Sequence, residues 1–414
     1  MNAPNIQKLS KCRACRSPSL QRFLHLPKMP FTDNFVTSEG WGSEFKEDID
    51  IFVCKNCFTA QTQHNVDVDV YYEDYQYAVG DSALARKFMR SLAERLKKAY
   101  YPSSSKKKVL EIGSGDGEQL IAFKETNCRV LGYEPSSILC EISESKGVPT
   151  IQGLFNAASI EMLPPDFLDV DVIMLSYTFD HLPDPVAFLK SASDILNKNE
   201  GLLVVEIHNL EKIFERQEYC LFEHEHSIYL TEQTVVQLCQ SAGLVVIDFD
   251  LIPESERRAN SLIFIASPSS GKFASKEVQP RTSSAFSDLA FYDSVGSNIQ
   301  SGIKNLEEFV DRMSSKGKKL IGYGAGGRGV MTLAAMRNAG KLLYVIDKKP
   351  KAIGLLMPKT GLPVYPIEHL NIEPVDEILV FSFGYMKEIQ AELSVFGYKP
   401  HQFHSLLDVL AGRF

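Results

Sequence analysis

A glycine-rich turn follows a short apolar run at residues 109–117 of this 414-residue chain, where the sequence reads Val-Leu-Glu-Ile-Gly-Ser-Gly-Asp-Gly. An apolar run followed at once by closely spaced glycines is typical of the first strand, loop and helix of an α/β unit that binds a nucleotide cofactor. Glycine lets the loop backbone turn sharply and approach a ligand closely. The turn therefore predicts a largely parallel sheet, with a ligand at the carboxyl ends of its strands.

Two Cys-x-x-Cys pairs precede this turn. Each pair presents two sulfurs to one point, and four thiolates can enclose a Zn²⁺ ion tetrahedrally. A shell of four thiolates has no open position for a substrate, so we interpret the metal as structural. The alternative is that the pairs are redox-active or merely buried thiols. The expected zinc ligands are Cys12, Cys15, Cys54 and Cys57.

Segments with different patterns follow one another along the chain. Residues 1–83 mix short apolar runs with proline and aromatic residues, which suits a small domain stabilised by a metal ion. In residues 84–267, helix-length segments separate the expected strands, which predicts a mostly parallel sheet with helices on both faces. Residues 268–284 are polar and rich in turn-forming residues, so we interpret them as a linker. Residues 285–414 are predicted to form a second, Rossmann-like α/β domain.

Apolar periodicity places the elements of the two α/β segments. The expected helices include residues 84–99 and a long one at residues 286–313. The expected strands cover residues 109–112, 130–133, 170–176, 201–207, 245–250 and 319–322.

The spacing of the first glycine turn discriminates between two cofactors. It reads GxGxG with an acidic residue two positions earlier, which favours S-adenosylmethionine, whereas NAD sites carry GxGxxG; NAD and an empty structural turn remain the alternatives. Glu134 ends the next expected strand and is placed to accept hydrogen bonds from ribose hydroxyls. Ser176 begins a loop at the same edge of the sheet. The expected cofactor-binding residues are Glu111, Gly113, Gly115, Gly117, Glu134 and Ser176.

A second glycine-rich turn lies at residues 322–329. Read as GxGxxG through Gly322, Gly324 and Gly327, with Asp347 at the end of the next expected strand, it matches the dinucleotide fingerprint. This pattern supports an alternative function, an NAD-dependent oxidoreductase. The helix N-terminus that such a turn creates binds any phosphate, and the turn can also serve packing alone.

Residues 222–226, Phe-Glu-His-Glu-His, place two histidines and two glutamates in one short segment. The spacing is not that of an HExxH zinc site. A histidine with a carboxylate neighbour fits a general base better, because imidazole titrates near neutral pH. The alternative is a charged loop exposed to solvent.

Composition restricts the classes of partner. The net charge of −8 argues against a nucleic-acid binder with a broad basic surface. The sequence has no uninterrupted apolar run long enough to span a membrane, and its first residues lack the apolar core of a signal peptide. With reduced thiols, these features predict a cytoplasmic protein without a membrane partner.

The order of these motifs resembles the three-domain sugar C-methyltransferases, which methylate C3 of nucleotide-linked 4-keto-deoxysugars. The resemblance covers essentially the whole chain and implies an N-terminal zinc-binding domain, a central class I S-adenosylmethionine-dependent methyltransferase domain and a C-terminal Rossmann-like domain around the substrate. It implies that His226 is the general base, that Glu225 is its neighbour, and that tyrosines of residues 72–77 enter the active site. The expected catalytic residues are His226, Glu225, Tyr75, Tyr77 and His181.

By the same resemblance, the second glycine turn serves the nucleotide side of the substrate. His226 is expected to remove the proton next to the ketone before methyl transfer to C3, with a tyrosine or His181 bound to the developing oxyanion. Two departures, Glu223 in place of a common tyrosine and Ala-Asn-Ser-Leu at residues 259–262 in place of Gly-Gly-Ser-Leu, leave the sugar and the accepting atom open. The expected substrate-binding residues are Glu223, His224, Asn260, Tyr323, Gly324 and Arg328.

Overall fold

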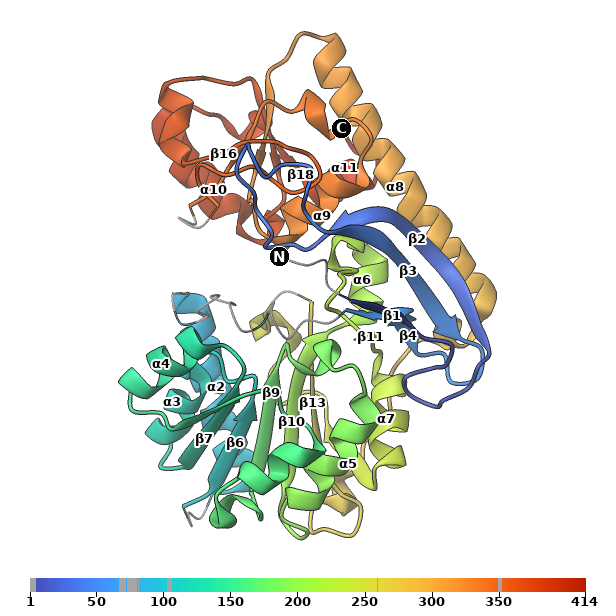
Figure 1. Ribbon diagram of the computed structural model, residues 1–414, viewed down its shortest axis with the longest axis vertical. Coiled ribbons are helices and arrows are strands. Elements are labelled where there is room, and N and C mark those ends of the chain that lie inside the picture. The colour runs from blue at the N-terminus through green and yellow to red at the C-terminus, as the bar shows by residue number, and fades with distance from the viewer. Residues whose placement is uncertain are drawn as a thin grey trace.

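The computed structural model describes residues 5–66, 72, 80, 82–102, 106–258, 260–348 and 352–414. A seven-stranded sheet with its helices forms the lower half of the molecule in Figure 1, and a five-stranded sheet with its helices forms the upper half. A four-stranded sheet from the N-terminal segment runs along one side and links the two halves. The fold is therefore α/β with a small N-terminal β domain.

The seven-stranded sheet has the order β12-β13-β10-β9-β6-β7-β8. Only β13 runs antiparallel to its neighbours among the described strands of this sheet. The expected strands are present within a few residues of their predicted bounds, and the sequence reading missed β8 and β13. The strands are β6 (Lys108–Ile112), β7 (Arg129–Glu134), β8 (Thr150–Gln152), β9 (Val172–Ser176), β10 (Leu202–His208), β12 (Leu244–Asp248) and β13 (Ser261–Pro268).

Helices cover both faces of this sheet. Alternate residues of β9 enter different cores, with Ile173 on one face and Val172 on the other, because successive side chains of a strand point to opposite faces. Helix α2 (Ala83–Tyr100) buries Phe88 and Leu92 on the Val172 face, one helical turn apart. The other helices are α3 (Glu118–Glu125), α4 (Ser137–Ser145), α5 (Pro185–Ile195), α6 (Leu210–Arg216) and α7 (Glu232–Ser241).

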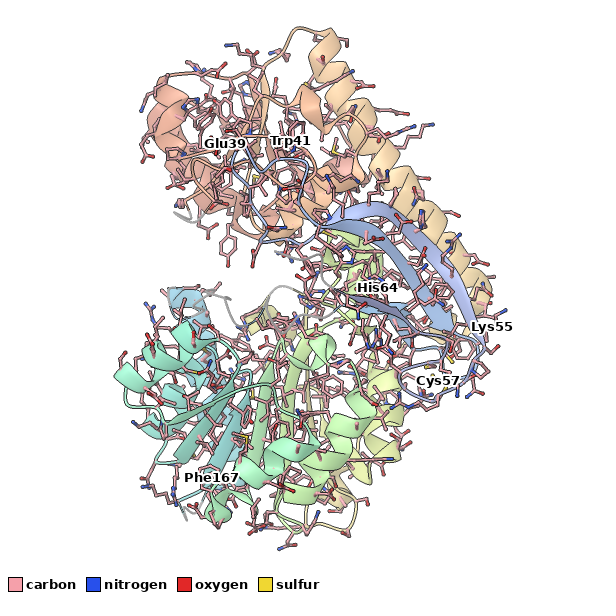
Figure 2. The ribbon with its side chains drawn as sticks, in the orientation of Figure 1. Glu39, Trp41, Lys55, Cys57, His64 and Phe167 are labelled. Atoms are coloured by element: carbon pink, nitrogen blue, oxygen red, sulfur yellow. The ribbon has the colours of Figure 1, made fainter. Side chains whose placement is uncertain are left out.

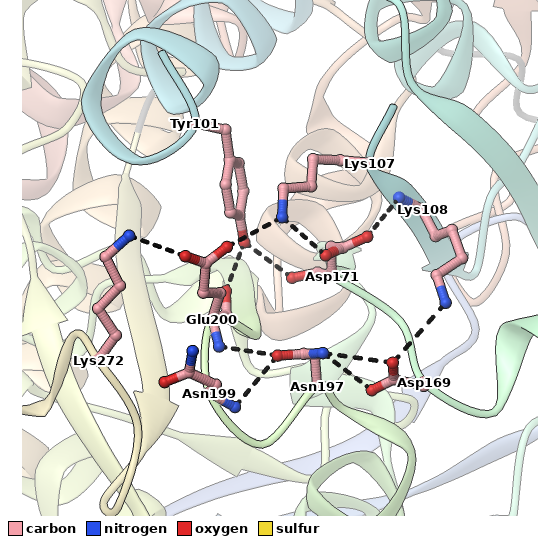
Figure 3. Close-up of polar contacts among 9 residues, drawn as sticks. All are labelled: Tyr101, Lys107, Lys108, Asp169, Asp171, Asn197, Asn199, Glu200 and Lys272. Carbon is pink, nitrogen blue, oxygen red and sulfur yellow. Dashed lines mark hydrogen bonds and ion pairs between the residues drawn. The ribbon is translucent and has the colours of Figure 1, made fainter. Parts of the chain in front are cut away.

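Polar side chains hold the amino edge of the sheet together (Figure 3). Asp171, just before β9, accepts hydrogen bonds from the backbone N–H of Lys108 at 2.8 Å and from Nζ of Lys107 at 3.0 Å. Nζ of Lys107 also donates to Glu200, before β10, at 3.1 Å, and the hydroxyl of Tyr101 donates to the carbonyl of Glu200 at 2.7 Å. These contacts join the starts of β6, β9 and β10 at the amino edge of the sheet. The candidate site lies at the opposite, carboxyl edge.

The N-terminal sheet includes a strand from the methyltransferase-like segment. Its order is β11-β4-β3-β2, and β11 (Ile228–Tyr229) pairs with β4 directly after the His-Glu-His run. The pairing anchors the histidine loop to the N-terminal domain. The remaining strands are β1 (Ile6–Lys8), β2 (Leu20–Pro30), β3 (Lys46–Cys54), β4 (Ala60–Thr62) and β5 (His64–Val66), of which β1 and β5 form a separate pair.

The C-terminal unit is a parallel five-stranded sheet of order β16-β15-β14-β17-β18. The long helix α8 (Leu289–Ser315) leads into it and packs directly on β2, where a Cβ at Gly296 would lie 1.9 Å from the carbonyl oxygen of Phe23. No helix among the described residues is long and apolar enough to cross a membrane. The other elements are β14 (Leu320–Tyr323), α9 (Gly327–Ala335), β15 (Val345–Ile346), β16 (Val364–Tyr365), β17 (Glu377–Val380), α10 (Met386–Leu393), β18 (Phe403–Ser405) and α11 (Leu406–Leu410).

Candidate functional site

Four cysteine sulfurs converge at the end of the N-terminal sheet. Sγ of Cys12 lies 3.6 Å from Sγ of Cys57, and Sγ of Cys15 lies 3.5 Å from Sγ of Cys54. All four sulfurs lie within 4.8 Å of one another. This donor set fits a tetrahedral zinc ion, and four thiolates complete the coordination shell.

The two cysteine turns share one backbone geometry. The N–H of Arg16 donates to the carbonyl of Cys12 at 3.0 Å, and the N–H of Phe58 donates to the carbonyl of Cys54 at 2.9 Å. Arg16 and Phe58 have φ angles of 64° and 59°, so each turn closes through a left-handed residue. Figure 2 shows Cys57 at the outer end of the N-terminal sheet, beyond His64. The metal site is therefore structural and lies apart from the histidine loop.

The three glycines of the first turn have different roles. A Cβ at Gly113 would lie 2.4 Å from Oγ1 of Thr178, and one at Gly117 would lie 2.5 Å from Oγ of Ser143, so both positions are fixed by packing. Gly115, with a φ of 53°, would meet no described atom within 4 Å. The space beside Gly115 lies at the carboxyl edge of the sheet, where a cofactor of this fold is expected.

Glu134 lies at the end of β7 and faces the same turn. Its carboxylate accepts the backbone N–H of Gly115 at 2.8 Å and that of Ser136 at 2.9 Å. Burial raises the pKa of Glu134, and the two amide hydrogen bonds oppose this shift. The sequence predicted this carboxylate as a ribose acceptor, and the structure places it against the central glycine.

Glu111 is buried beneath the glycine turn. Oε2 of Glu111 has no hydrogen-bond partner among the described residues. Burial raises its pKa well above the ordinary value, and the negative charges of Asp116 and Glu134 add to this shift. A buried carboxylate oxygen without a partner is suited to a cationic group such as the ammonium of a methionine moiety.

Ser176 belongs to a buried ion-pair network at the end of β9. Its hydroxyl donates to Oε2 of Glu206 at 2.8 Å, and Arg258 binds both Ser176 and Glu206. The guanidinium of Arg258 also lies over the ring of Tyr177, 4.9 Å from the centroid. Arg258 directly precedes residues 259–262, and it places a cation beside the expected cofactor residue Ser176.

His226 lies in a cluster of titratable residues at the carboxyl edge. Its ring centroid is 4.7 Å from that of His181 and 5.0 Å from that of His208. Nδ1 of His208 lies 2.7 Å from Oδ2 of Asp180. Asp180 follows β9, and His208 ends the neighbouring strand β10. Both residues therefore lie at the carboxyl edge of the sheet, and this position could have identified them as candidates from the sequence.

Burial controls the protonation of this cluster. It lowers the pKa of His226, and a protonated His208 lowers it further. It also lowers the pKa of His181 to about 3. Burial alone would raise the pKa of Asp180, but the hydrogen bond with His208 and the neighbouring imidazoles hold it below the ordinary value. His181 and His226 are thus neutral imidazoles beside an ionised carboxylate at neutral pH.

The hydrogen bond to His226 fixes its tautomer. Nδ1 of His226 lies 2.8 Å from the carbonyl oxygen of Leu221. Because a carbonyl only accepts, Nδ1 carries the proton and Nε2 of the neutral ring has a free lone pair. A carbonyl oxygen of the main chain therefore orients the proposed base, and the charge of Glu225 raises its pKa.

The two glutamates of the run form a buried carboxyl pair. Glu223 and Glu225 share a side-chain hydrogen bond, and Oγ1 of Thr32 donates to Glu225 at 3.3 Å. Burial raises the pKa of both groups, well above the ordinary value for Glu223. A Cβ at Gly327 would lie 3.0 Å from Oε1 of Glu223, so the second glycine turn, the N-terminal segment and the histidine loop meet here.

His224 has a structural environment that differs from that of His226. Its Nε2 donates to the carbonyl of Met29 at 2.8 Å, and its Nδ1 lies 2.9 Å from Nε2 of His64. Burial lowers the pKa of His224 to about 3 and that of His64 to about 4. Both nitrogens of His224 are therefore used to join the loop to the N-terminal domain.

The expected substrate residues of the C-terminal unit separate into two groups. Tyr323 donates its hydroxyl to Glu392 at 3.2 Å within that unit, away from the histidine cluster. Nε of Arg328 lies 3.3 Å from the buried Glu218, which also accepts a hydrogen bond from Asn260. Arg328 and Asn260 thus meet at one carboxylate where the two α/β units join.

The second glycine turn repeats the geometry of the first. Gly324 has a φ of 104°, and the backbone N–H of the next residue, Ala325, donates to Oδ2 of Asp347 at 2.5 Å. Tyr75 and Tyr77 lie outside the described residues. Tyr72 is described, and its hydroxyl lies 2.5 Å from Nδ1 of His181.

Comparisons with known proteins match the whole arrangement. The family described as "Putative zinc binding domain" matches residues 12–72, that described as "Methyltransferase domain" matches residues 83–248, and that described as "C-methyltransferase C-terminal domain" matches residues 268–405. C-methyltransferase NovU of Streptomyces niveus is 24% identical over 394 residues, which cover 93% of this chain and 92% of the relative. The chain belongs to the three-domain C-methyltransferase family.

This methyltransferase also matches other proteins over parts of its length. An uncharacterized methyltransferase of Bacillus pumilus is 34% identical over 76 residues, 18% of this chain and 34% of the relative. The solved complex of the Haloferax volcanii Trm112 methyltransferase activator and its partner methyltransferase is 18% identical, with a TM-score of 0.37, over 49% of this chain and 98% of that chain. The family assignment establishes S-adenosylmethionine-dependent C-methyl transfer, with S-adenosylmethionine as cofactor and zinc in the N-terminal domain.

Proposed function

We propose that this methyltransferase transfers a methyl group to the carbon next to the ketone of a nucleotide-linked ketosugar, C3 of a 4-ketosugar. The observation that carries the proposal is the environment of His226, whose Nδ1 is held by Leu221 and whose ring lies among His181, His208 and Asp180. When bound, S-adenosylmethionine supplies an electrophilic methyl group. The residues of the chain then have to create a nucleophilic carbon.

His226 is suited to remove a proton from carbon. A C–H bond next to a carbonyl is acidic enough for an imidazole base if the enolate oxygen is stabilised. Burial lowers the pKa of His226, so its Nε2 is available as a base at neutral pH. The Tyr72 hydroxyl, which contacts His181, supports the expectation that an N-terminal tyrosine binds the developing oxyanion.

The junction of the two α/β units supports a nucleotide-linked acceptor. The second glycine turn starts helix α9, whose N-terminal amides suit a phosphate group. Gly327 at this turn faces Glu223 of the histidine loop, and Arg328 lies beside it. A sugar nucleotide bound with its phosphates at α9 would extend its sugar toward His226.

The test is a screen of nucleotide-linked 4-ketosugars with S-adenosylmethionine that carries a ¹³C-labelled methyl group. Mass spectrometry should detect the gain of one CH₂ unit, and NMR should place the labelled methyl on the carbon next to the ketone. His226→Asn should leave S-adenosylmethionine binding intact and lower the transfer rate about 10²- to 10⁴-fold, the range for loss of a positioned acid–base group. His401→Asn, at an exposed histidine, is the matched control and should retain the wild-type rate.

Methylation at oxygen or nitrogen would contradict carbon transfer. A His226→Asn enzyme with nearly the wild-type rate would show that another group is the base. Transfer to free ketosugars at the rate of their nucleotide-linked forms would contradict the nucleotide requirement.

A further inference from the structure

His208 has a partner and an orientation that the proposed methyl transfer does not use. It ends β10, and its Nδ1 lies 2.7 Å from Oδ2 of Asp180 in the short turn Phe179–His181. Its ring is tilted by 45° to that of His226, with the centroids 5.0 Å apart. One nitrogen of each ring and an oxygen of Asp180 all lie within 4.8 Å of one another.

The hydrogen bonds leave the same nitrogen available on both rings. Nδ1–H of His226 is held by the carbonyl of Leu221, and Nδ1–H of His208 is held by the carboxylate of Asp180. Each neutral ring therefore has its lone pair on Nε2. A proton that His226 gains at Nε2 therefore has an unprotonated nitrogen in the neighbouring ring of His208, whose centroid lies 5.0 Å away.

A buried carboxylate, that of Asp180, contacts His208. Asp180 is 4% exposed, and the hydrogen bond with His208 and the adjacent imidazoles keep its pKa low enough for it to be ionised. Glu225 faces His226 from the histidine loop, but its burial raises its pKa. His181 lies against His226, and burial keeps His181 neutral near pH 7. The negative charge of the cluster thus resides on the residue that contacts His208.

Two tyrosines of the described residues also contact the cluster. Tyr177 packs on His208 with the ring centroids 4.7 Å apart, and burial raises the pKa of its hydroxyl. Tyr72 contacts His181 rather than His208. The side chain of His208 is 17% exposed, which provides a route by which a proton can reach solvent.

We propose that Asp180 and His208 are positioning residues that take the proton away from His226 in each catalytic cycle. This inference rests on the proposed function, in which His226 removes one proton from the acceptor carbon. As the C–H bond breaks, its electron pair forms the enolate and the proton binds Nε2 of His226. The proton then passes to Nε2 of His208, whose imidazolium pairs with Asp180, and finally to solvent, so that His226 regains its lone pair and one proton leaves per methyl transferred.

The first test needs no acceptor. Histidine side chains are followed by NMR titration in the zinc-loaded full-length protein, with His226 assigned from the His226→Asn spectrum. Asp180→Asn removes a negative charge and should lower the pKa of His226, whereas His208→Gln removes a positive one and should raise it. Opposite shifts support the relay, because loss of packing alone gives no reason for opposite signs.

An unchanged pKa of His226 in both variants, or shifts of the same sign, would overturn the proposal. If Asp180→Asn does not fold, the rise expected for His208→Gln decides by itself. A second equivalent of bound metal that is lost in Asp180→Asn would also overturn it, because the three groups would then hold an ion instead of relaying a proton.

The second test uses an acceptor found by the screen. His208→Gln should lower kcat about 10- to 100-fold, up to the lower end of the range for an acid–base group, with little change in KM or in S-adenosylmethionine affinity. Imidazole in the buffer should restore part of the turnover of His208→Gly but not that of His208→Gln, which leaves no space for it. A His208→Gln enzyme with the wild-type kcat would contradict the proposed proton relay. If the wild-type enzyme methylates no ketosugar, the proposed function fails while the NMR coupling still decides whether the pair exists.

Discussion

Glu134 accepts the backbone N–H of Gly115 at 2.8 Å, which places an acidic side chain at the one glycine of the first turn that has open space beside it. The same relationship recurs in the C-terminal unit between Asp347 and the N–H of Ala325. An acidic residue at the end of the second strand thus closes the glycine turn in both Rossmann-like units. The two turns differ in the side chains that lie against them: Thr178 beside Gly113 in the first unit, and Glu223 beside Gly327 in the second.

Glu134→Gln should weaken S-adenosylmethionine binding. The variant removes the charged acceptor proposed for the ribose hydroxyls, which should cost about 1.5–3 kcal/mol of binding free energy, the scale of a hydrogen bond to a charged group. Isothermal titration calorimetry measures the change directly. Glu141→Gln, at an exposed glutamate of α4, is the control, and equal affinities of the two variants would mean that the cofactor lies elsewhere.

Cys54→Ser should abolish stoichiometric zinc binding and unfold the N-terminal sheet. A structural zinc site contributes its binding free energy to folding, so loss of one of four thiolates removes that contribution. Metal analysis should fall from about one zinc per chain to none, and thermal unfolding should begin at a lower temperature. Cys128→Ser, outside the cluster, should keep its zinc. Retention of zinc by Cys54→Ser would contradict the four-thiolate assignment.

The acid limb of kcat/KM should lie below the ordinary histidine pKa of about 6.5. Burial lowers the pKa of His226, so the neutral base persists as the pH falls and is lost only when the pH drops through this lowered value. Asp180→Asn removes a charge that raises the pKa of His226, so its acid limb should move to still lower pH. Measurements of kcat/KM from pH 5 to 8 locate the acid limb. A limb above pH 6.5 in the wild-type enzyme would contradict the assignment of His226 as the base.

Glu223→Gln should change how stability depends on pH. Burial raises the pKa of Glu223 in the folded protein, so its contribution to stability is fully present below the unfolded value of about 4.5 and decreases as the pH rises toward the folded value. The variant cannot ionise at this position and should therefore gain Tm relative to the wild type between pH 5 and pH 8. Glu39→Gln, at an exposed glutamate, should show no such gain. An identical pH dependence of Tm in wild type and Glu223→Gln would refute the buried carboxyl pair.

Elements with a strong local signal could be predicted from the sequence. The expected helix at residues 84–99 is present as α2, and the long helix at residues 286–313 is present as α8. Strand β8 was missed because it has only three residues and is only partly buried, so it carries little apolar pattern. Strand β13 was missed although all its residues are buried, because a fully buried strand does not alternate between apolar and polar residues.

The sequence by itself determined the cysteine pairs, the glycine turns and the expected carboxylate Glu134, because each depends on a few neighbouring residues or on the fixed direction of a parallel strand. Tertiary structure decided which polar groups surround His226. Asp180 lies in the turn after β9 and His208 ends β10, and only the pairing of these strands brings them together. The sequence could not distinguish His224 from His226, since the difference arises from contacts with His64 and Met29 on one ring and with Leu221 on the other. Local turns are specified by short-range sterics, whereas the protonation of a histidine depends on burial and on charges that distant segments supply.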